Sequence, residues 1–445
     1  MSRDIHKKKH LSSFQLIILG FAGVILLGAI ILMLPVSSAE GVMTPFNQTL
    51  FTSTSAVCVT GLAVLDTGSY WSVFGQVVIL LLIQIGGLGV VTVAVSVFML
   101  SGRKISLMQR STMQNAISAH KVGGIVRLTK FILKGTLFVE MAGALALLPV
   151  FYHDFGRKGI WMAVFHSISA FCNAGFDILG TPTNPFPSIT AYAGNPIVNV
   201  VIMFLIIAGG IGFLTWEDIC INKIHFRKYH MQSKIIFVTT ALLIVLPAVF
   251  FFFSDFTHLS VGKRLLASAF QAVTPRTAGF NTMDISKMTE VSKAMIIILM
   301  LVGGSPSSTA GGMKTTTFAV LILNAFATFR SQENVETFGR RIECSVIKNA
   351  STIAMMYCML FLCGGITISV YEGLPLSECL YEAASAVGTV GLTLGITPKL
   401  HIVSQFILII LMYLGRVGGL TLIYAVLSKK KKGNARLPLE KITVG

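Results

Sequence analysis

Charged side chains are scarce in this sequence. Only 12% of its 445 residues are Asp, Glu, Lys or Arg, whereas 54% are hydrophobic, and the mean hydropathy is +0.78. A soluble fold of this composition would lack the polar surface that it needs to cover itself. Several apolar runs reach the roughly 20 residues that crossing a bilayer requires. The composition therefore excludes a soluble globular protein and predicts a polytopic membrane protein.

Acidic residues are scarcer than basic ones. The chain has 18 Asp and Glu against 35 Lys and Arg, which gives a net charge of +17. The basic residues gather in short connectors at 103–130, 223–234, 330–348 and 429–432, and the other connectors hold most of the acids. This asymmetry follows the positive-inside rule. We expect a multi-pass protein of the cell (plasma) membrane with both termini in the cytoplasm and no nucleic acid partner.

Motifs for metal, nucleotide or catalytic chemistry are also missing. The seven cysteines form no CxxC pair and have no histidine partners at metal spacing, and the chain contains no GxGxxG unit. His166 and Ser167 are adjacent, so on a helix their side chains point apart. We expect no enzyme activity and no cofactor bound by this chain.

A short segment that ends in glycine and a large apolar residue occurs four times. The glycines are Gly61, Gly175, Gly279 and Gly391, and the intervals between them are 175 − 61 = 114, 279 − 175 = 104 and 391 − 279 = 112 residues. A period this regular indicates four copies of one structural unit. Each copy is preceded by an amphipathic stretch that is too short to span a bilayer and is flanked by two long apolar runs.

We therefore predict an all-α membrane fold with eight transmembrane helices and four re-entrant pore loops. Its four span-loop-span repeats surround one pore. The predicted parts are an N-terminal tail (1–13), repeat 1 (14–100), repeat 2 (131–219), repeat 3 (233–329), repeat 4 (350–428) and a C-terminal tail (429–445). Only the second span of repeat 3 is predicted to be broken. Both tails are expected to be cytoplasmic.

The four glycine loops suit a pore that conducts ions. Non-helical backbone inside a membrane is tolerated where protein buries it or where it lines a watery cavity. Rings of backbone carbonyls can replace the hydration shell of a cation. Pointing successive carbonyls toward one axis needs alternating backbone hands, and glycine reaches positive φ at little cost.

With these loops the chain resembles the Trk/Ktr/HKT superfamily of potassium transporters, and most closely the bacterial Ktr membrane subunit, which translocates potassium. The segment Thr389-Val390-Gly391-Leu392 comes nearest to the potassium-channel signature. Some sodium-selective plant relatives have serine in the first loop, where this chain has Gly61, so the resemblance favours potassium. It implies that the carbonyls of a selectivity filter come from Val59, Thr60, Gly61, Asn173, Ala174, Gly175, Thr277, Ala278, Gly279, Thr389, Val390 and Gly391.

A polar stretch interrupts the second span of the third repeat. Its glycines and hydroxyl residues favour an irregular intramembrane segment. A phosphate-binding loop would need GxxxxGK, but Met313 separates Gly312 from Lys314. We interpret the stretch as a gate below the filter, and the resemblance implies the same. The predicted gate residues are Gly303, Gly304, Ser305, Pro306, Ser307, Ser308, Thr309, Ala310, Gly311, Gly312, Met313 and Lys314, together with the intramembrane Arg416.

The resemblance further implies a homodimer that is regulated by a cytosolic ring of Ktr regulatory (KtrA-like) subunits. Any nucleotide would be bound by that partner, and potassium would be the substrate. The alternative is a secondary cation transporter coupled to sodium or protons. Such transporters usually have two repeats and a pair of broken helices, whereas this sequence has four repeats and one evident break.

Overall fold

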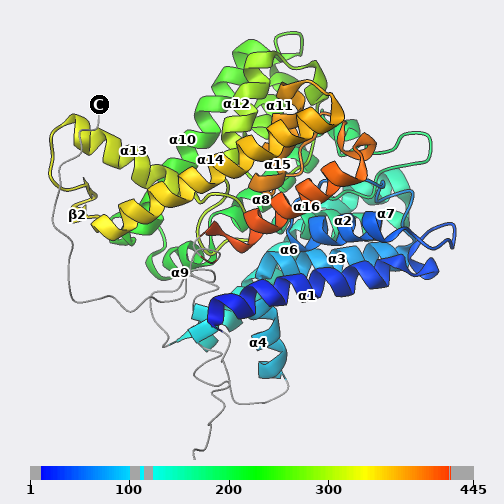
Figure 1. The fold of residues 1–445 in the computed structure, drawn as a ribbon, viewed down its shortest axis with the longest axis horizontal. Coiled ribbons are helices and arrows are strands. Elements are labelled where there is room, and N and C mark those ends of the chain that lie inside the picture. Colours follow the sequence, from blue (N-terminus) through cyan, green and yellow to red (C-terminus); the bar gives the residue numbers. More distant parts are fainter. Residues whose placement is uncertain (1–11, 101–110, 115–123, 420, 422–445) are drawn as a thin grey trace, which may run out of the picture.

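Figure 1 shows the computed structural model, which describes residues 12–100, 111–114, 124–419 and 421. The described chain is mostly helical, and its helices follow the four-fold order of the sequence. Each unit consists of a first long helix, a half-helix that ends at a glycine loop, and a second apolar segment. Units 1 and 2 comprise α1 (Ser13–Met33), α2 (Phe46–Val57), α3 (Val73–Leu88) and α4 (Val90–Leu100), then α6 (Ile125–Phe155), α7 (Lys158–Phe171), α8 (Pro196–Gly210) and α9 (Phe213–Asn222).

Units 3 and 4 complete the chain. They comprise α10 (Met231–Ser254), α11 (Val261–Val273), α12 (Glu290–Leu301) and α13 (Thr315–Phe329), then α14 (Cys344–Glu372), α15 (Leu376–Gly388) and α16 (Ile402–Val417). Short 3-10 turns lie at Pro35–Ser37, Thr190–Tyr192, Phe226–Lys228, Ile285–Lys287 and Thr397–Lys399. A two-stranded antiparallel hairpin of β1 (Glu336–Thr337) and β2 (Arg340–Arg341) separates α13 from α14.

The second apolar segments are broken more often than the sequence analysis predicts. Within the described residues, α3 and α4 meet at 99° and α8 and α9 at 97°, in addition to the interruption between α12 and α13. Figure 1 shows α4 leaving the direction of α3. The bends fall at Gly89 and Gly212, and α16 ends in the same way at Gly418, each with φ between 85° and 92°. Glycine alone adopts this backbone readily, so the expectation of a single broken span was wrong.

These breaks affect the count of spans. By length and composition the described chain has four helices able to cross a membrane, namely those of α1, α6, α10 and α14, or six if each bent pair is one span. The helices α13 and α16 are apolar but shorter. The predicted number of eight spans is therefore not established by helix length.

The half-helices α2, α7, α11 and α15 form the centre of the fold. Their C-terminal turns are buried except for the partly buried Ile168 of α7, and the large side chains buried around them include Phe51, Phe171, Phe270 and Tyr381. The outer helices instead expose many large apolar side chains, among them Leu27, Phe138, Leu246 and Met355. This distribution places the polar half-helices inside and the apolar surface outside, as a lipid solvent requires.

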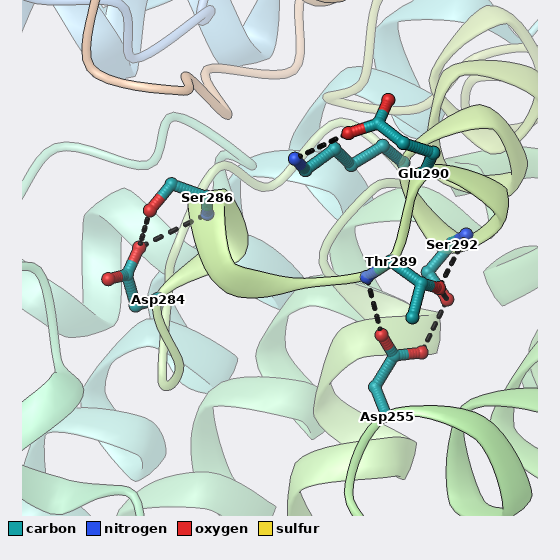
Figure 2. Close-up of polar contacts among 7 residues, drawn as sticks. Asp255, Asp284, Ser286, Thr289, Glu290 and Ser292 are labelled. Atoms are coloured by element: carbon teal, nitrogen blue, oxygen red, sulfur yellow. Dashed lines mark hydrogen bonds and ion pairs between the residues drawn. The ribbon is translucent and has the colours of Figure 1, made fainter.

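An acid at the end of one long helix caps the next apolar helix. Asp255, which follows α10, accepts a hydrogen bond of 2.8 Å from the backbone N–H of Thr289 and another from the hydroxyl of Ser292 at the start of α12 (Figure 2). In unit 4, Glu372 at the end of α14 accepts 2.9 Å and 2.7 Å bonds from the backbone N–H and Nδ1 of His401. These carboxylates satisfy N–H groups that a helix start leaves unpaired, and they fix the two apolar segments of a unit to each other.

Candidate functional site

The four glycine loops share one backbone conformation. In each loop the first and third residues have positive φ, whereas the residue between them has ordinary negative φ. The positive values are Val59 58° and Gly61 91°, Asn173 58° and Gly175 67°, Thr277 67° and Gly279 78°, and Thr389 52° and Gly391 93°. Alternating hands turn successive carbonyls of an extended segment toward the same side.

This conformation is costly at the first position of each loop. Val59, Thr277 and Thr389 are β-branched, and such residues seldom adopt positive φ. A sparsely populated backbone region costs roughly 1–3 kcal/mol for each residue, and it persists where the surrounding packing imposes it. Strain repeated at the equivalent position of separate units points to a shared functional geometry.

The glycine loops meet in a closed ring. A Cβ atom added to the glycine of any loop would collide with the carbonyl oxygen that precedes the glycine of the next loop; at Gly175 the separation would be 2.6 Å and at Gly279 2.5 Å. The four neighbours are Gly61 with Ala174, Gly175 with Ala278, Gly279 with Val390, and Gly391 with Thr60. The loops thus follow one another in chain order around a common centre, and all twelve residues of the predicted filter lie in this ring.

Hydroxyl groups of the half-helices hold the loops in two different ways. Ser55 accepts a 3.1 Å hydrogen bond from the N–H of Gly61, and Ser385 accepts one of 3.0 Å from the N–H of Gly391. In the other two loops a hydroxyl donates to the carbonyl after the glycine, from Ser169 to Phe176 (2.7 Å) and from Thr274 to Phe280 (2.6 Å). The ring is therefore only approximately four-fold.

A direct side-chain link joins the second and third loops. In the amide orientation that gives both its oxygen and its nitrogen a partner, Asn173 accepts a hydrogen bond of 3.1 Å from the hydroxyl of Thr277 and donates to the carbonyls of Ile206 and Ala170. Arg276, next to Thr277, is buried, and its Nε has no hydrogen-bond partner within the described residues. Asn173 and Arg276 have no counterpart in the other loops, so these contacts belong to this side of the ring alone.

The predicted gate residues form one irregular loop, 303–314, between α12 and α13. Its two ends pair with each other, because the N–H of Gly303 donates to Met313 at 2.8 Å and the N–H of Thr315 donates to Gly304 at 3.0 Å. Its middle binds unit 2, where the N–H of Ser305 donates to Gly210 at 2.9 Å. The loop is therefore a hairpin anchored to the neighbouring unit.

This loop lies directly against the glycine ring. A Cβ atom on Gly303 would be 3.2 Å from Cγ2 of Thr277, and one on Gly312 would be 2.9 Å from the carbonyl oxygen of Gly388. Gly311 meets the side chain of Thr389 in the same way. The first residues of the third and fourth glycine loops thus rest on the 303–314 loop, which leaves no room for side chains at its glycines.

Arg416 connects this loop to two other units. Its guanidinium donates to the carbonyl of Thr309 in the loop and to the carbonyls of Gly86 and Gly87 in α3, the last at 3.2 Å. Lys314 donates to the carbonyls of Ala310 at 2.7 Å and Gly311 at 3.5 Å. Neither cation has an acidic partner among the described residues. Both line a cavity of about 220 Å³ beside the loop.

Comparisons with known proteins agree with this arrangement. The sequence model of the TrkH family, described as "Cation transport protein", matches residues 12–434. The chain belongs to the TrkH family of cation transport proteins. Its relatives include the potassium/sodium uptake protein NtpJ of Enterococcus hirae, which is 38% identical over 98% of each chain. Another is the Ktr system potassium uptake protein B of Bacillus subtilis, which is 37% identical over 97% of this chain and 96% of that protein.

The structure also has the fold of a solved member of this family. The crystal structure of the potassium transporter TrkH from Vibrio parahaemolyticus superposes with a TM-score of 0.74 at 17% identity, covering 96% of this chain and 87% of that one. This TrkH-family chain is therefore a membrane transporter and not an enzyme, as the sequence indicates. His166, which the enzyme alternative considered, is a buried residue of α7 whose Nδ1 bonds the carbonyl of Met162 at 2.8 Å.

A second cavity lies on the other side of the ring in this TrkH-family chain. It measures about 140 Å³ and is lined by all four ring glycines together with Asp66 and Asp177. Asp66 is already engaged, because it accepts hydrogen bonds from the N–H groups of Ser69 and Phe186, both at 2.8 Å. Burial, and to a smaller extent the nearby Asp66, raises the pKa of Asp177 to about 7.

Sequence reasoning missed a carboxylate at the centre of α6. Glu140 is buried and accepts hydrogen bonds of 3.0 Å and 3.2 Å from the amide of Gln84 on α3. The thiol of Cys172, which follows half-helix α7, lies 4.0 Å from Glu140 and 3.5 Å from Gln84. A lone Glu in a long apolar run is a signal for a polar contact inside a membrane, and it could have been noticed.

Proposed function

We propose that this protein takes up potassium across the cell membrane through one central pathway. The observation that carries the proposal is the closed ring of four glycine loops with alternating backbone hands. Such a ring can offer neutral carbonyl oxygens in place of a hydration shell, which is how known filters accept potassium. Two relatives support the choice of ion by their names, the Ktr system potassium uptake protein B of Bacillus subtilis and the potassium/sodium uptake protein NtpJ of Enterococcus hirae.

The filter of this pathway is formed by the backbone of the twelve ring residues. Gly61 matters most among them, because serine in its place is the variant that the resemblance associates with sodium. The packing of Gly61 against the Ala174 carbonyl supports this, since any side chain there would push two loops apart. Potassium selectivity then follows from a ring whose spacing each neighbouring loop maintains.

The 303–314 loop acts as the gate, and Arg416 stabilises its closed state. The loop lies against two of the four glycine loops, and Arg416 binds it to α3 on the opposite side. The two cations near the loop also oppose the passage of a positive ion, because like charges in a weakly polar medium repel strongly. Opening requires the loop to release Arg416 and to move away from Thr277 and Thr389.

The chain is organised as four repeats around this pore, at 14–100, 131–219, 233–329 and 350–428, and each bent second segment counts as one span. Both tails (1–13 and 429–445) lie in the cytoplasm, as the positive-inside rule favours. The active form is a homodimer with a cytosolic ring of KtrA-like regulatory subunits that binds the nucleotide. The names of relatives as proteins of a "Ktr system" support a regulated assembly.

A second candidate function is cation transport coupled to sodium or protons. Two observations favour it. NtpJ of Enterococcus hirae is named a potassium/sodium uptake protein. In addition, the second apolar segment is interrupted not only in unit 3 but also in units 1 and 2, where it is bent. Paired broken helices are typical of coupled transporters. The ring of four loops favours the first candidate.

One experiment separates the two. The purified protein is placed in liposomes, and the uptake of the potassium analogue rubidium is measured with and without a sodium or proton gradient. Uptake that follows the rubidium gradient and the membrane potential alone supports the pore. Uptake that stops without a gradient of the second ion supports the coupled transporter, and an absence of uptake with any gradient contradicts both.

A further inference from the structure

Lys314 sits on the gate loop in a position that a transported cation could also take. Its ammonium group bonds the carbonyl oxygen of Ala310 at 2.7 Å and faces that of Gly311 at 3.5 Å. The preceding carbonyl, that of Thr309, is bonded by Arg416. Three successive backbone oxygens are therefore occupied by two side-chain cations.

These oxygens have no other use in the described part of the chain. Four backbone N–H groups of the loop donate to Gly209, Gly210, Met313 and Gly415, and no backbone N–H of the described residues donates to the carbonyls of residues 309–311. A buried carbonyl without a partner is unfavourable, because it has lost its hydrogen bonds to water. Any change that removes Lys314 from the loop thus leaves oxygens that need a new cation or donor.

The ligand chemistry of this small site is that of a monovalent cation. Neutral carbonyl oxygens bind potassium by replacing its hydration shell, and an alkyl-ammonium head is a compact charge that the same oxygens accept through hydrogen bonds. No carboxylate balances Lys314 within the described residues, so the site does not call for a divalent ion.

We propose that Lys314 is a tethered substitute for the transported ion: in the closed gate its ammonium group fills a monovalent-cation site formed by the carbonyls of Ala310 and Gly311. The inference rests on the proposed gate and deepens it. When the loop opens, Lys314 withdraws into the adjacent cavity of about 220 Å³, which it already lines, and the freed oxygens receive the permeating potassium. Lys314 is therefore a positioning residue of the closed state.

The test is chemical rescue of Lys314→Ala. Rubidium uptake by this variant in liposomes is expected to exceed that of the unchanged protein by about ten-fold or more, since a charge-assisted hydrogen bond is lost. Millimolar methylammonium on both sides of the membrane should then lower uptake toward the original level, and the bulkier tetramethylammonium should not. Lys234→Ala is the matched control, because Lys234 also donates to a backbone carbonyl, at 2.8 Å, but is only partly buried and lies outside the loop.

Hydrogen exchange of peptides that cover 303–314 gives a readout independent of transport. Exchange should be faster in Lys314→Ala and should slow again with methylammonium; Lys314→Arg, whose planar fork fits the site less well, should be intermediate. Unchanged uptake and exchange in Lys314→Ala, or a change that methylammonium does not reverse, would overturn the proposal. If the unchanged protein carries no rubidium, the proposed function fails, while the exchange experiment still decides whether the ammonium site exists.

Discussion

Arg416 donates a hydrogen bond from Nη1 to the carbonyl oxygen of Thr309, although 107 residues separate them in the sequence. This contact joins the last apolar helix of the chain to the loop that interrupts the third unit. The same guanidinium reaches the carbonyls of Gly86 and Gly87 in the first unit. One side chain therefore holds three units together at the proposed gate.

Arg416→Met should raise rubidium uptake in liposomes by about ten-fold or more, because it removes charge-assisted bonds that hold the closed loop. The preference for potassium over sodium should stay the same, since the glycine ring does not contact Arg416 through any hydrogen bond among the described residues. Arg264→Met is the control, as Arg264 bonds a backbone carbonyl, that of Phe252, away from the loop. Uptake unchanged from the original protein would show that Arg416 does not close the gate.

Gly61→Ser should lower the preference for potassium over sodium by about ten-fold, which corresponds to about 1.4 kcal/mol. The new side chain would meet the Ala174 carbonyl, and its backbone would have to keep a φ of 91°. Competition of sodium with rubidium uptake measures the preference. Gly41→Ser is a matched control, because Gly41 also has positive φ, 69°, but open space around it; an equal preference in both variants would mean that the first loop is only scaffold.

Asp177→Asn should remove a pH dependence of uptake near neutrality. Because the pKa of Asp177 is raised to about 7, its carboxyl is neutral below this pH and negative above it. A negative charge in the cavity at the ring attracts cations, so uptake by the unchanged protein should rise as the pH increases from about 6 to 8. The unfolded chain ionises Asp177 at the ordinary aspartate pKa, whereas the folded protein does so only near pH 7. The stability of the fold should therefore fall progressively as the pH rises between these two values.

The comparison for this prediction is Asp154→Asn. Asp154 is an exposed acid in the last turn of α6 that bonds His153 and Tyr192. It should remain ionised throughout the range, and its replacement should leave the pH profile as it is. If Asp177→Asn keeps the profile of the unchanged protein, the titrating group lies elsewhere.

Asp255→Ala should lower the unfolding temperature of the detergent-solubilised protein. The carboxylate caps α12 through the N–H of Thr289 and the hydroxyl of Ser292 (Figure 2), and its loss should cost about 1–2 kcal/mol. Although burial alone would raise it, these hydrogen bonds and that of Ser254 hold the pKa of Asp255 below its usual value. Its stabilisation should therefore be complete at neutral pH and fall away as the solution is acidified below the usual aspartate pKa.

Asp284→Ala serves as the control for this cap. Among the described residues, Asp284 bonds Ser286 in the neighbouring turn (Figure 2) and forms an ion pair with Lys287. It is more exposed than Asp255. Its replacement should change the unfolding temperature much less. An equal fall in the unfolding temperature of the two variants would show that the hydrogen bonds of Asp255 between α10 and α12 do not stabilise the fold more than a local turn does.

The local backbone of the glycine loops could be read from the sequence because it depends on residue type. The backbone conformation at Gly61 and its three equivalents needs glycine, and these four glycines recur at near-equal intervals in the sequence. The same reasoning should have extended to the helix breaks. The segments Gly86-Gly87-Leu88-Gly89, Gly209-Gly210-Ile211-Gly212 and Gly415-Arg416-Val417-Gly418 share a final glycine at each break, and in the last of them Arg416 replaces a glycine.

By itself, then, the sequence determined the membrane character of the chain, its four-fold order and the four ring glycines, since these follow from apolar run length and from the conformational range of glycine. The other eight residues of the ring were named from the family resemblance. Only the tertiary structure decided which loops are neighbours, where Arg416 and Lys314 place their charges, and that Glu140 meets Gln84 inside the protein. Apart from those of Lys314, which bonds carbonyls three and four residues before it, these contacts join residues tens to hundreds of positions apart. They depend on how whole helices pack, which no local pattern of side chains specifies.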